Sequence, residues 1–326
     1  MITGENVATL GDIAKRLDKD GRIDVIVEML TQTNEILEDM MFREGNLPTG
    51  HKTTIRTGLP AAAWRLLNYG VKQSKSKTQQ ITDTCGMLEA YAEVDKALAD
   101  LNGNTGAFRL SEDRAFTEAM NQEMAKTLFY GDTSKNPERF LGIAPRYSTL
   151  DKSKAATAEN IIDAGGTGNN LTSIYLPCWG EQTIFGIYPK GSKAGFQHKD
   201  LGEVTLMDAD GGQFQGYRTH YKWDIGLVLR DWRYLVRIPN INLATITDEQ
   251  LIDLMIMASE QLPDLKLGRP VFYMHKTVRT RLRQAIRKDK NVHLALDQVA
   301  GKRVLSFDEI PVKRCDAISL SEARVS

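Results

Sequence analysis

The fold is decided by one stretch of the chain, Glu44-Gly45-Asn46-Leu47-Pro48-Thr49-Gly50-His51-Lys52-Thr53-Thr54-Ile55-Arg56-Thr57-Gly58-Leu59-Pro60. Its glycines and prolines interrupt helical structure, whereas residues 53–57 have the composition of a strand. Gly, Pro, Thr and Lys remain frequent as far as about residue 80. We therefore expect residues 43–80 to form an extended, solvated arm.

Helical patterns flank this arm on both sides. Apolar residues between 22 and 41 lie roughly on one helical stripe, which ends before the arm. After the arm, residues 87–101 carry apolar side chains at spacings of three and four, which predicts a second helix. A third helix is expected over residues 111–129, where Ser111 is placed to cap it and apolar residues recur at every fourth position.

Loops, strands and helices follow one another irregularly in the second half. Residues 151–170 have loop composition, and residues 217–229 place apolar side chains at odd positions, as in a strand with one buried face. Thr247-Asp248-Glu249-Gln250 is a capping box before an amphipathic helix. A basic helix follows the apolar run 271–274, and strand-like pieces end the chain. This mixture, without an internal repeat, predicts an α+β class.

The composition is that of an ordinary globular protein without a dominant charge. The 326 residues are 41% hydrophobic and 26% charged, and 42 Lys+Arg balance 42 Asp+Glu. This balance disfavours coat proteins that condense nucleic acid with basic tails. The sequence shows no export signal and no apolar run long enough to span a membrane. The three cysteines lie far apart, which predicts neither a zinc site nor a disulfide framework.

Motifs for catalysis or cofactor binding are absent from the sequence. It contains no GxxxxGK[ST], GxSxG, HExxH or GxGxxG, and its five histidines lack metal-ligand spacing. Asp208-Ala209-Asp210-Gly211-Gly212 lacks the later ligands of a calcium loop, so a hairpin turn is the favoured interpretation. The glycine-rich run 165–170 is interpreted as a surface loop rather than a phosphate site. We expect no enzyme, cofactor or metal site, and an enzyme built on these two loops is the disfavoured alternative.

Basic side chains gather on the helix after residue 275. Arg279, Arg283 and Arg287 are placed to face nucleic acid, a neighbour's acidic edge, or only solvent. Solvation alone is the favoured interpretation of such a charge run. A sequence-independent nucleic-acid binder is the corresponding alternative, and the zero net charge of the chain argues against it.

The opening stretch, followed by Trp64-Arg65 and Asn68-Tyr69-Gly70-Val71, closely resembles the major capsid proteins of epsilon-fifteen-like podophages. Tyr130-Gly131-Asp132, residues 270–274 and Ile310-Pro311-Val312 are similar to segments of the Hong Kong 97-type phage capsid fold. The resemblance covers most of the chain. It implies an α+β fold that begins with an N-terminal arm and first helix (1–42) and an extended hairpin arm, or E-loop (43–80). A peripheral domain (81–150) with a spine helix at 111–129 follows. A variable, β-rich linking region (151–245) then leads to an axial domain (246–326).

The same resemblance implies a function. It predicts a virion protein that assembles into hexamers and pentamers of an icosahedral head around double-stranded DNA, without catalysis or a cofactor. Portal, scaffold and decoration or cementing proteins are implied partners. The scaffold is expected to be a separate protein, because the first helix begins after about twenty residues. An encapsulin-type bacterial shell is the alternative with the same fold. The implied candidates for inter-subunit contacts are side chains of the arm: Lys52, Arg56, Trp64, Arg65, Lys72, Lys75 and Lys77.

Overall fold

A long sheet runs through the molecule and carries its other elements. The computed structural model describes residues 32–101, 105–208, 210–288, 294–299 and 302–326. The helices are α2 (Ile36–Asp39), α3 (Lys96–Ala99), α4 (Thr105–Tyr130), α5 (Ile143–Arg146), α6 (Asp248–Gln261) and α7 (Lys276–Lys288), with the short 3-10 helices η2 (Ala156–Asn160), η3 (Trp232–Tyr234) and η4 (Leu265–Leu267). The strands are β1 (Phe42–Glu44), β2 (Gly50–Gly58), β3 (Lys77–Asp95), β4 (Leu171–Trp179), β5 (Ile184–Tyr188), β6 (Gln197–Met207), β7 (Gln213–Leu229), β8 (Leu235–Asn242), β9 (Arg269–Pro270), β10 (Phe272–Met274), β11 (Leu294–Val299), β12 (Lys302–Phe307) and β13 (Ile310–Arg314).

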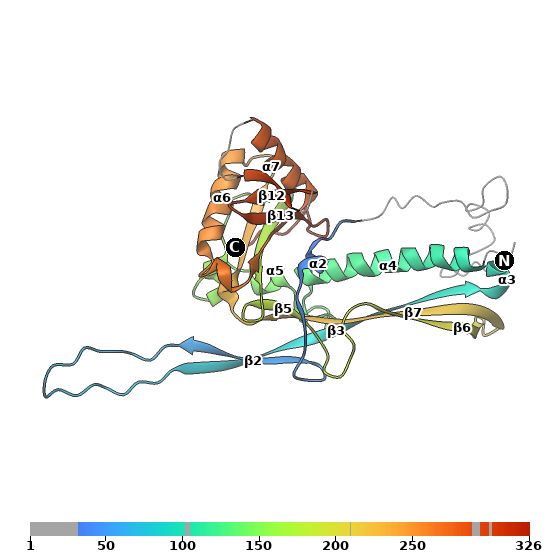
Figure 1. Ribbon diagram of the computed structural model, residues 1–326, viewed down its shortest axis with the longest axis horizontal. Helices are drawn as coiled ribbons and strands as arrows, with labels where there is room; N and C mark the ends of the chain where they lie inside the picture. Colours follow the sequence, from blue (N-terminus) through green and yellow to red (C-terminus); the bar gives the residue numbers. More distant parts are fainter. Residues whose placement is uncertain (1–31, 102–104, 209, 289–293, 300–301) are drawn as a thin grey trace.

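These elements form three parts, which Figure 1 shows side by side. Helix α4 lies along a narrow sheet of β3, β7 and β6, which we call the peripheral part. A second body, the axial part, contains α6, α7, β12 and β13 and stands beside one end of α4. The hairpin that begins with β2 extends away from both parts.

The strand order joins the three parts into one path. Among the described residues it is β11-β12-β13-β10-β4-β5-β7-β3-β2, with β6 on β7 and β8 on β4. Strand β3 pairs with β2 in the arm and then, from Cys85 to Asp95, with β7 in the peripheral part. The arm is therefore a continuation of the peripheral sheet and not a separately attached loop.

Strand β4 separates two hydrophobic cores because its side chains alternate between its faces. Ile174 and Leu176 pack in the axial core together with residues of α6 and α7. Tyr175 and Trp179 pack in the other core against α4 and β7. All nine residues of β4 are buried, as expected for a strand with a core on each of its faces.

The prediction of a helix over residues 87–101 is wrong. Most of this segment is the extended strand β3, followed by the single turn α3. Met87, which the helical spacing placed on the inner face, is 70% exposed, whereas Ala92 and Val94 are each 3% exposed. The buried positions follow a period of two, because β7 pairs with β3 from Cys85 to Asp95 and α4 covers one face of this pair.

Two other expected helices have different bounds from those predicted. Helix α4 begins at Thr105 and not at Ser111, because Phe108 packs against the end of β3 and against α3 and so extends the helix. Residues 22–31 of the first expected helix lie outside the described residues. The described remainder of that helix contains only the turn α2, and the chain is extended in β1 from Phe42.

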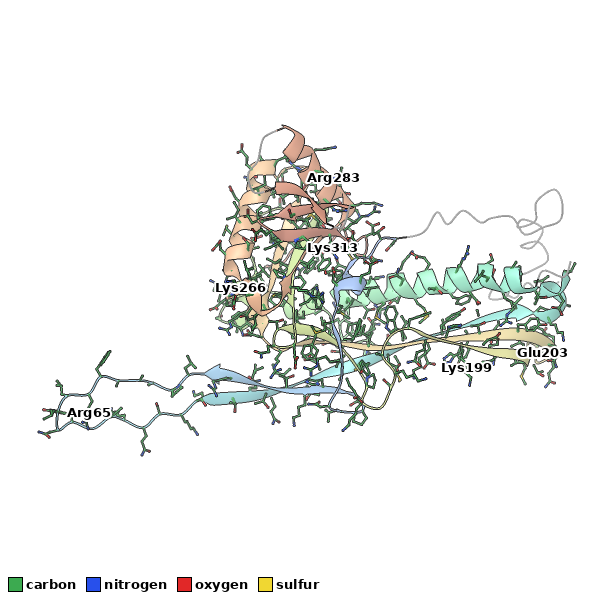
Figure 2. All side chains as sticks on the ribbon, in the orientation of Figure 1. Arg65, Lys199, Glu203, Lys266, Arg283 and Lys313 are labelled. Carbon is green, nitrogen blue, oxygen red and sulfur yellow. The ribbon has the colours of Figure 1, made fainter. Side chains whose placement is uncertain are left out.

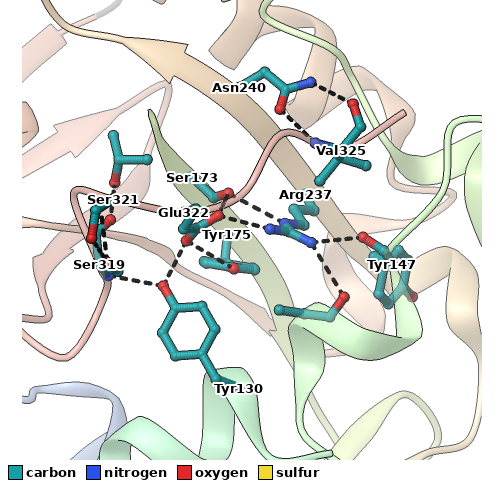
Figure 3. A network of polar contacts seen from close by, with 12 residues as sticks. Tyr130, Tyr147, Ser173, Tyr175, Arg237, Asn240, Ser319, Ser321, Glu322 and Val325 are labelled. Atoms are coloured by element: carbon teal, nitrogen blue, oxygen red, sulfur yellow. Dashed lines mark hydrogen bonds and ion pairs between the residues drawn. The ribbon is translucent and has the colours of Figure 1, made fainter. Parts of the chain in front are cut away.

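The C-terminal residues join the axial and peripheral parts through a buried ion pair (Figure 3). The Arg237 guanidinium of β8 donates to the Glu322 carboxylate at 2.7 Å, and the two side chains are 5% and 6% exposed. Arg237 also donates to the backbone oxygens of Ala144 and Tyr147, near α5. Tyr130, at the end of α4, donates its hydroxyl proton to Glu322 at 2.6 Å. One carboxylate thus links β8 with the last residue of α4.

Backbone contacts continue this attachment to the end of the described chain. Asn240 has a left-handed backbone with φ of 61°, and its side chain both donates to the Val325 oxygen and accepts from the Val325 amide. The Glu322 amide donates to the Leu171 oxygen at 2.8 Å. We call residues 319–326 the C-terminal clasp.

Candidate subunit interface

A tight turn at the base of the arm sets its starting point. The Gly45 amide donates to the Tyr188 oxygen, and Leu47 and Gly50 exchange backbone hydrogen bonds. A Cβ atom at Gly50 would fall on the Asp83 oxygen of β3, so only glycine allows the two strands to approach here. The side chain of Asn46 closes the turn by accepting from the Lys52 amide at 2.7 Å and donating to the Lys52 oxygen at 2.8 Å.

A histidine also holds this turn. The His51 Nδ1 atom accepts from the Asn46 amide at 3.3 Å, which requires that this nitrogen is not protonated. Burial lowers the pKa of His51 below its ordinary value, although Asp83 opposes this effect. The neutral imidazole is therefore the form that fits the base of the arm.

An ion pair fixes the direction of the arm relative to the molecule. Strands β2 and β3 pair from Gly50 with Thr84 to Gly58 with Lys77. Asp83 of β3 is 4% exposed and lies 2.8 Å from the Arg146 guanidinium of α5. Arg146 also donates to the backbone oxygens of Leu141 and Leu227. The arm is thus tied at its base to a rigid part of the molecule.

The tip of the arm, residues 59–76, has few internal contacts. Every residue of this segment is exposed. Ser74 donates to the Ala61 oxygen and Tyr69 donates to the Leu66 oxygen, while Asn68 has a left-handed backbone with φ of 67°. An isolated two-stranded hairpin is at best marginally stable in water. Such a tip needs a partner to become rigid.

Large apolar side chains are concentrated on this tip. Trp64 is 105% exposed and Leu67 is 83% exposed, values that monomeric proteins seldom combine in one segment. The exposed apolar residues of the tip are Leu59, Trp64, Leu66, Leu67, Tyr69 and Val71. Only Trp64 was among the residues predicted from the sequence. The other large apolar residues of the tip were not predicted as contacts. The composition of the arm does contain a signal for them, because a segment without helix or strand gives its apolar side chains nothing of their own chain to pack against.

The predicted basic contacts lie along the same arm. Residues 45–80 contain six Lys or Arg and no Asp or Glu. Lys52, Arg56 and Lys77 are exposed on β2 and β3, whereas Arg65, Lys72 and Lys75 are exposed on the tip. Figure 2 labels Arg65 at the far end of the arm. The arm therefore presents apolar and cationic groups together, and a surface that binds it has to be apolar and acidic.

The basic helix presents its cations unequally. Arg283 of α7 is exposed, whereas Arg279 is half-buried, with Glu35 at 3.9 Å. Burial lowers the pKa of Arg279; Glu35 opposes this effect, and the like charges of Arg283 and Arg314 add to it. The side chain of Arg287 lies outside the described part of the structure. Arg279 and Arg283 are near each other, but the structure does not bring them together with the arm.

The backbone amides of the two glycine-containing loops are bound within the chain. Asp208 accepts from the amides of Asp210 and Gly212 and closes the turn between β6 and β7, which agrees with a hairpin turn. In the run 165–170, the Gly166 amide donates to the Asn240 oxygen instead of pointing at a ligand. Among the described residues no group of three His, Cys, Asp or Glu is arranged to hold a metal. No helix in the described ranges is long and apolar enough to cross a membrane.

Comparison with known proteins gives a consistent result. A family model described as major capsid protein GP7 matches residues 18–326. The near-atomic structure of bacteriophage Epsilon15 contains a chain with 35% identity and a TM-score of 0.78, and the match covers 99% of both chains.

More distant structures match as well. The capsid of bacteriophage JBD30 has 11% identity and a TM-score of 0.49, covering 89% of this chain and 93% of that one. The encapsulin of Synechococcus elongatus has 11% identity and a TM-score of 0.44, covering 74% and 99%. No curated protein sequence matches.

Proposed function

Because the chain belongs to the family of the major capsid protein GP7, we propose that it builds the hexamers and pentamers of an icosahedral phage head around double-stranded DNA. It is a phage capsid subunit with the Hong Kong 97-type fold and assembles in the virion with copies of itself. The family favours this function over an encapsulin-type shell. We further propose that the role is structural and that the chain catalyses nothing.

The exposed apolar tip of the arm carries this proposal. Burying one Trp removes about 150–250 Å² from water, and at about 25 cal/mol per Å² this is worth roughly 4–6 kcal/mol before ordering costs. The arm extends away from the other described residues of its own chain, none of which covers these side chains (Figure 1). We propose that another molecule covers them. In a shell of identical subunits that molecule is a neighbouring copy.

The predicted contact residues take complementary roles in this proposal. Trp64 is the apolar anchor, since aromatic side chains dominate interface energies. Lys52, Arg56, Arg65, Lys72, Lys75 and Lys77 surround it and select an acidic surface, which steers the encounter more than it adds affinity. Weak contacts repeated by symmetry let a misplaced subunit leave before the shell closes.

The domain division follows the same function. We propose the range 43–80 as the E-loop, 81–150 as the peripheral domain, 151–245 as the linking region and 246–326 as the axial domain, preceded by an N-terminal arm in 1–42. Because β3 continues from the arm to Asp95, a force on the arm is transmitted directly to the sheet beneath α4. A scaffold, a portal and a decoration protein complete the proposed set of partners.

The substitution Trp64→Ala tests the role of the tip. Hot-spot truncations cost about 2 kcal/mol or more, so the subunit concentration needed for assembly should rise about 30-fold. The melting temperature of the free subunit should not change, because Trp64 contacts little of its own chain. Trp64→Phe, which keeps an aromatic anchor, serves as the control and should assemble near the wild-type concentration. Assembly is monitored by sedimentation velocity. If Trp64→Ala assembles at the same subunit concentration as the wild type, this role is refuted.

A further inference from the structure

Helices α6 and α7 of the axial part carry opposite charges. Helix α6 has four Asp or Glu and no Lys or Arg over Asp248–Gln261. Helix α7 has six Lys or Arg and no Asp or Glu over Lys276–Lys288. A balanced chain does not require this separation, and solvation alone is served better by mixed signs on each helix. The separation therefore needs an explanation beyond solubility.

Little of this charge is neutralised within the subunit. Arg281 of α7 binds Asp248 at the start of α6 at 2.6 Å and so fixes one helix against the other. The remaining acidic side chains of α6 are Glu249, Asp253 and Glu260, all exposed. Neither they nor Arg283 form a hydrogen bond or ion pair with another described residue. Glu35 lies 3.9 Å from Arg279 of α7, but the exposed charges of α6 and Arg283 of α7 stay available to a partner.

The acidic face has the composition of a docking surface. Glu249, Asp253, Met257 and Glu260 are exposed along one side of α6, opposite the buried Leu251, Met255 and Ala258. Met257 is 55% exposed and lies between the carboxylates. An apolar centre with a charged rim is the usual arrangement of a protein interface.

The basic face lies elsewhere on the axial part. Figure 1 shows α6 along one edge and α7 at the top, and Figure 2 places Arg283 on the side away from α6. Lys276, Arg279 and Arg283 recur at spacings of three and four, so they lie on one side of α7. Burial lowers the pKa of Arg279, Glu35 opposes this effect, and the like charges of Arg283 and Arg314 add to it.

A ring of identical subunits joins one surface of each copy to a different surface of the next. We propose that the acidic face of α6 in one copy binds the basic face of α7 in the next copy around each hexamer and pentamer. This contact rests on the proposed function, because it requires that the chain forms rings. It uses both charged faces once per subunit and leaves neither without a partner.

Reversal of each face tests the contact. Variant A carries Asp253→Lys and Glu260→Lys, and variant B carries Lys276→Glu and Arg283→Glu. Like charges then face each other in every ring of A alone and of B alone, so the concentration needed for assembly should rise tenfold or more, by an order-of-magnitude estimate. A chain with all four changes restores the pairing with opposite polarity and should assemble within about threefold of the wild type.

A mixture of A and B gives a further expected result. Alternating A and B subunits match at every contact of an even-membered ring, whereas a five-membered ring keeps one mismatched contact. The mixture should therefore restore hexamers in mass photometry and disfavour pentamers. Asp210→Lys with Glu138→Lys makes the same charge change on exposed positions outside α6 and should assemble like the wild type.

The outcomes separate this contact from the proposed function. If the wild type itself forms no capsomers, the proposed function fails. If the wild type assembles and A assembles equally well, the α6 contact is refuted. If B assembles like the wild type but loses salt-dependent affinity for double-stranded DNA, then α7 faces nucleic acid and the contact is refuted as well. If reversal of arm cations rescues A, the acidic face binds the arm of a neighbour and not α7, which also overturns the proposal.

Discussion

The C-terminal clasp gives the sharpest prediction for stability, through the substitution Glu322→Gln. The Arg237 and Glu322 side chains are 5% and 6% exposed and 2.7 Å apart, so solvent cannot replace the lost charge. Removing one partner of a buried ion pair typically costs about 3–5 kcal/mol, because the other charge stays buried. The Tyr130 hydroxyl and the Ser173 hydroxyl both donate to this carboxylate, and an amide has only one oxygen to accept them. We expect a loss of about 3–5 kcal/mol in the free energy of unfolding.

Thermal unfolding of the unassembled subunit measures this loss. The Trp64→Ala background keeps the subunits apart, so shell contacts do not add to the melting temperature. With an unfolding entropy of about 2.1 cal/mol/K per residue, the expected loss lowers the melting temperature by about 4–7 °C. The control is Asp231→Asn, which removes the charge of a pair with Arg233 at 2.7 Å whose side chains are 24% and 56% exposed. Exposed pairs contribute about 0–1 kcal/mol, so the control should melt within about 2 °C of its parent. A melting temperature of Glu322→Gln no lower than that of the control would refute the structural role of the clasp.

Two further predictions concern the base of the arm and helix α7. Gly50→Ala places a Cβ atom on the Asp83 oxygen, so the free energy of unfolding should fall by about 1–3 kcal/mol and hydrogen exchange in β2 should become faster. The control Gly70→Ala lies at an open position of the tip and should change neither quantity. Equal hydrogen exchange in both variants would contradict the tight turn. Burial lowers the pKa of His275, and its Nδ1 atom accepts a hydrogen bond from the Thr277 amide at the start of α7. Only the neutral imidazole can accept this bond. The contribution of His275 to stability is therefore present at pH 7.5 and is lost as the pH falls below about 6.5, the ordinary value, and through the lowered pKa of the folded state. His275→Asn keeps a helix cap that does not titrate, so it should reduce the loss of stability between pH 7.5 and 5.5. His275→Ala removes the cap and should lower the free energy of unfolding by about 1 kcal/mol at pH 7.5. An unchanged pH dependence in His275→Asn would contradict the capping role.

The sequence predicted the elements whose structure depends on residues close together in the chain. Thr247 and Gln250 form the expected capping box, because both partners lie within four residues of each other. The strand expected over 217–229 is present in β7, although both of its faces are buried near Leu229. On the second face Val228 packs with Phe185 and Ile187 of the adjacent strand β5. The extended arm also follows the prediction, since its glycines and prolines exclude other structure.

Tertiary contacts decided what the sequence left open. The apolar residues around Ala92 and Val94 fit a helical and an alternating period equally well, and only the pairing of β3 with β7 selects the strand. The partners Arg237 and Glu322 lie 85 residues apart, and no spacing rule links them. Exposure of Leu66 and Leu67 follows from their place on an arm that extends away from its own core, which the composition of the arm indicates but a count of apolar residues alone does not.

Electron microscopy of the purified, recombinant protein, alone and with the proposed scaffold protein, tests the central claim most directly. We predict closed shells or capsomer rings for the wild type, and their loss in Trp64→Ala at the same concentration. A wild-type protein that stays a monomer or dimer under both conditions would contradict the account of a self-assembling capsid subunit.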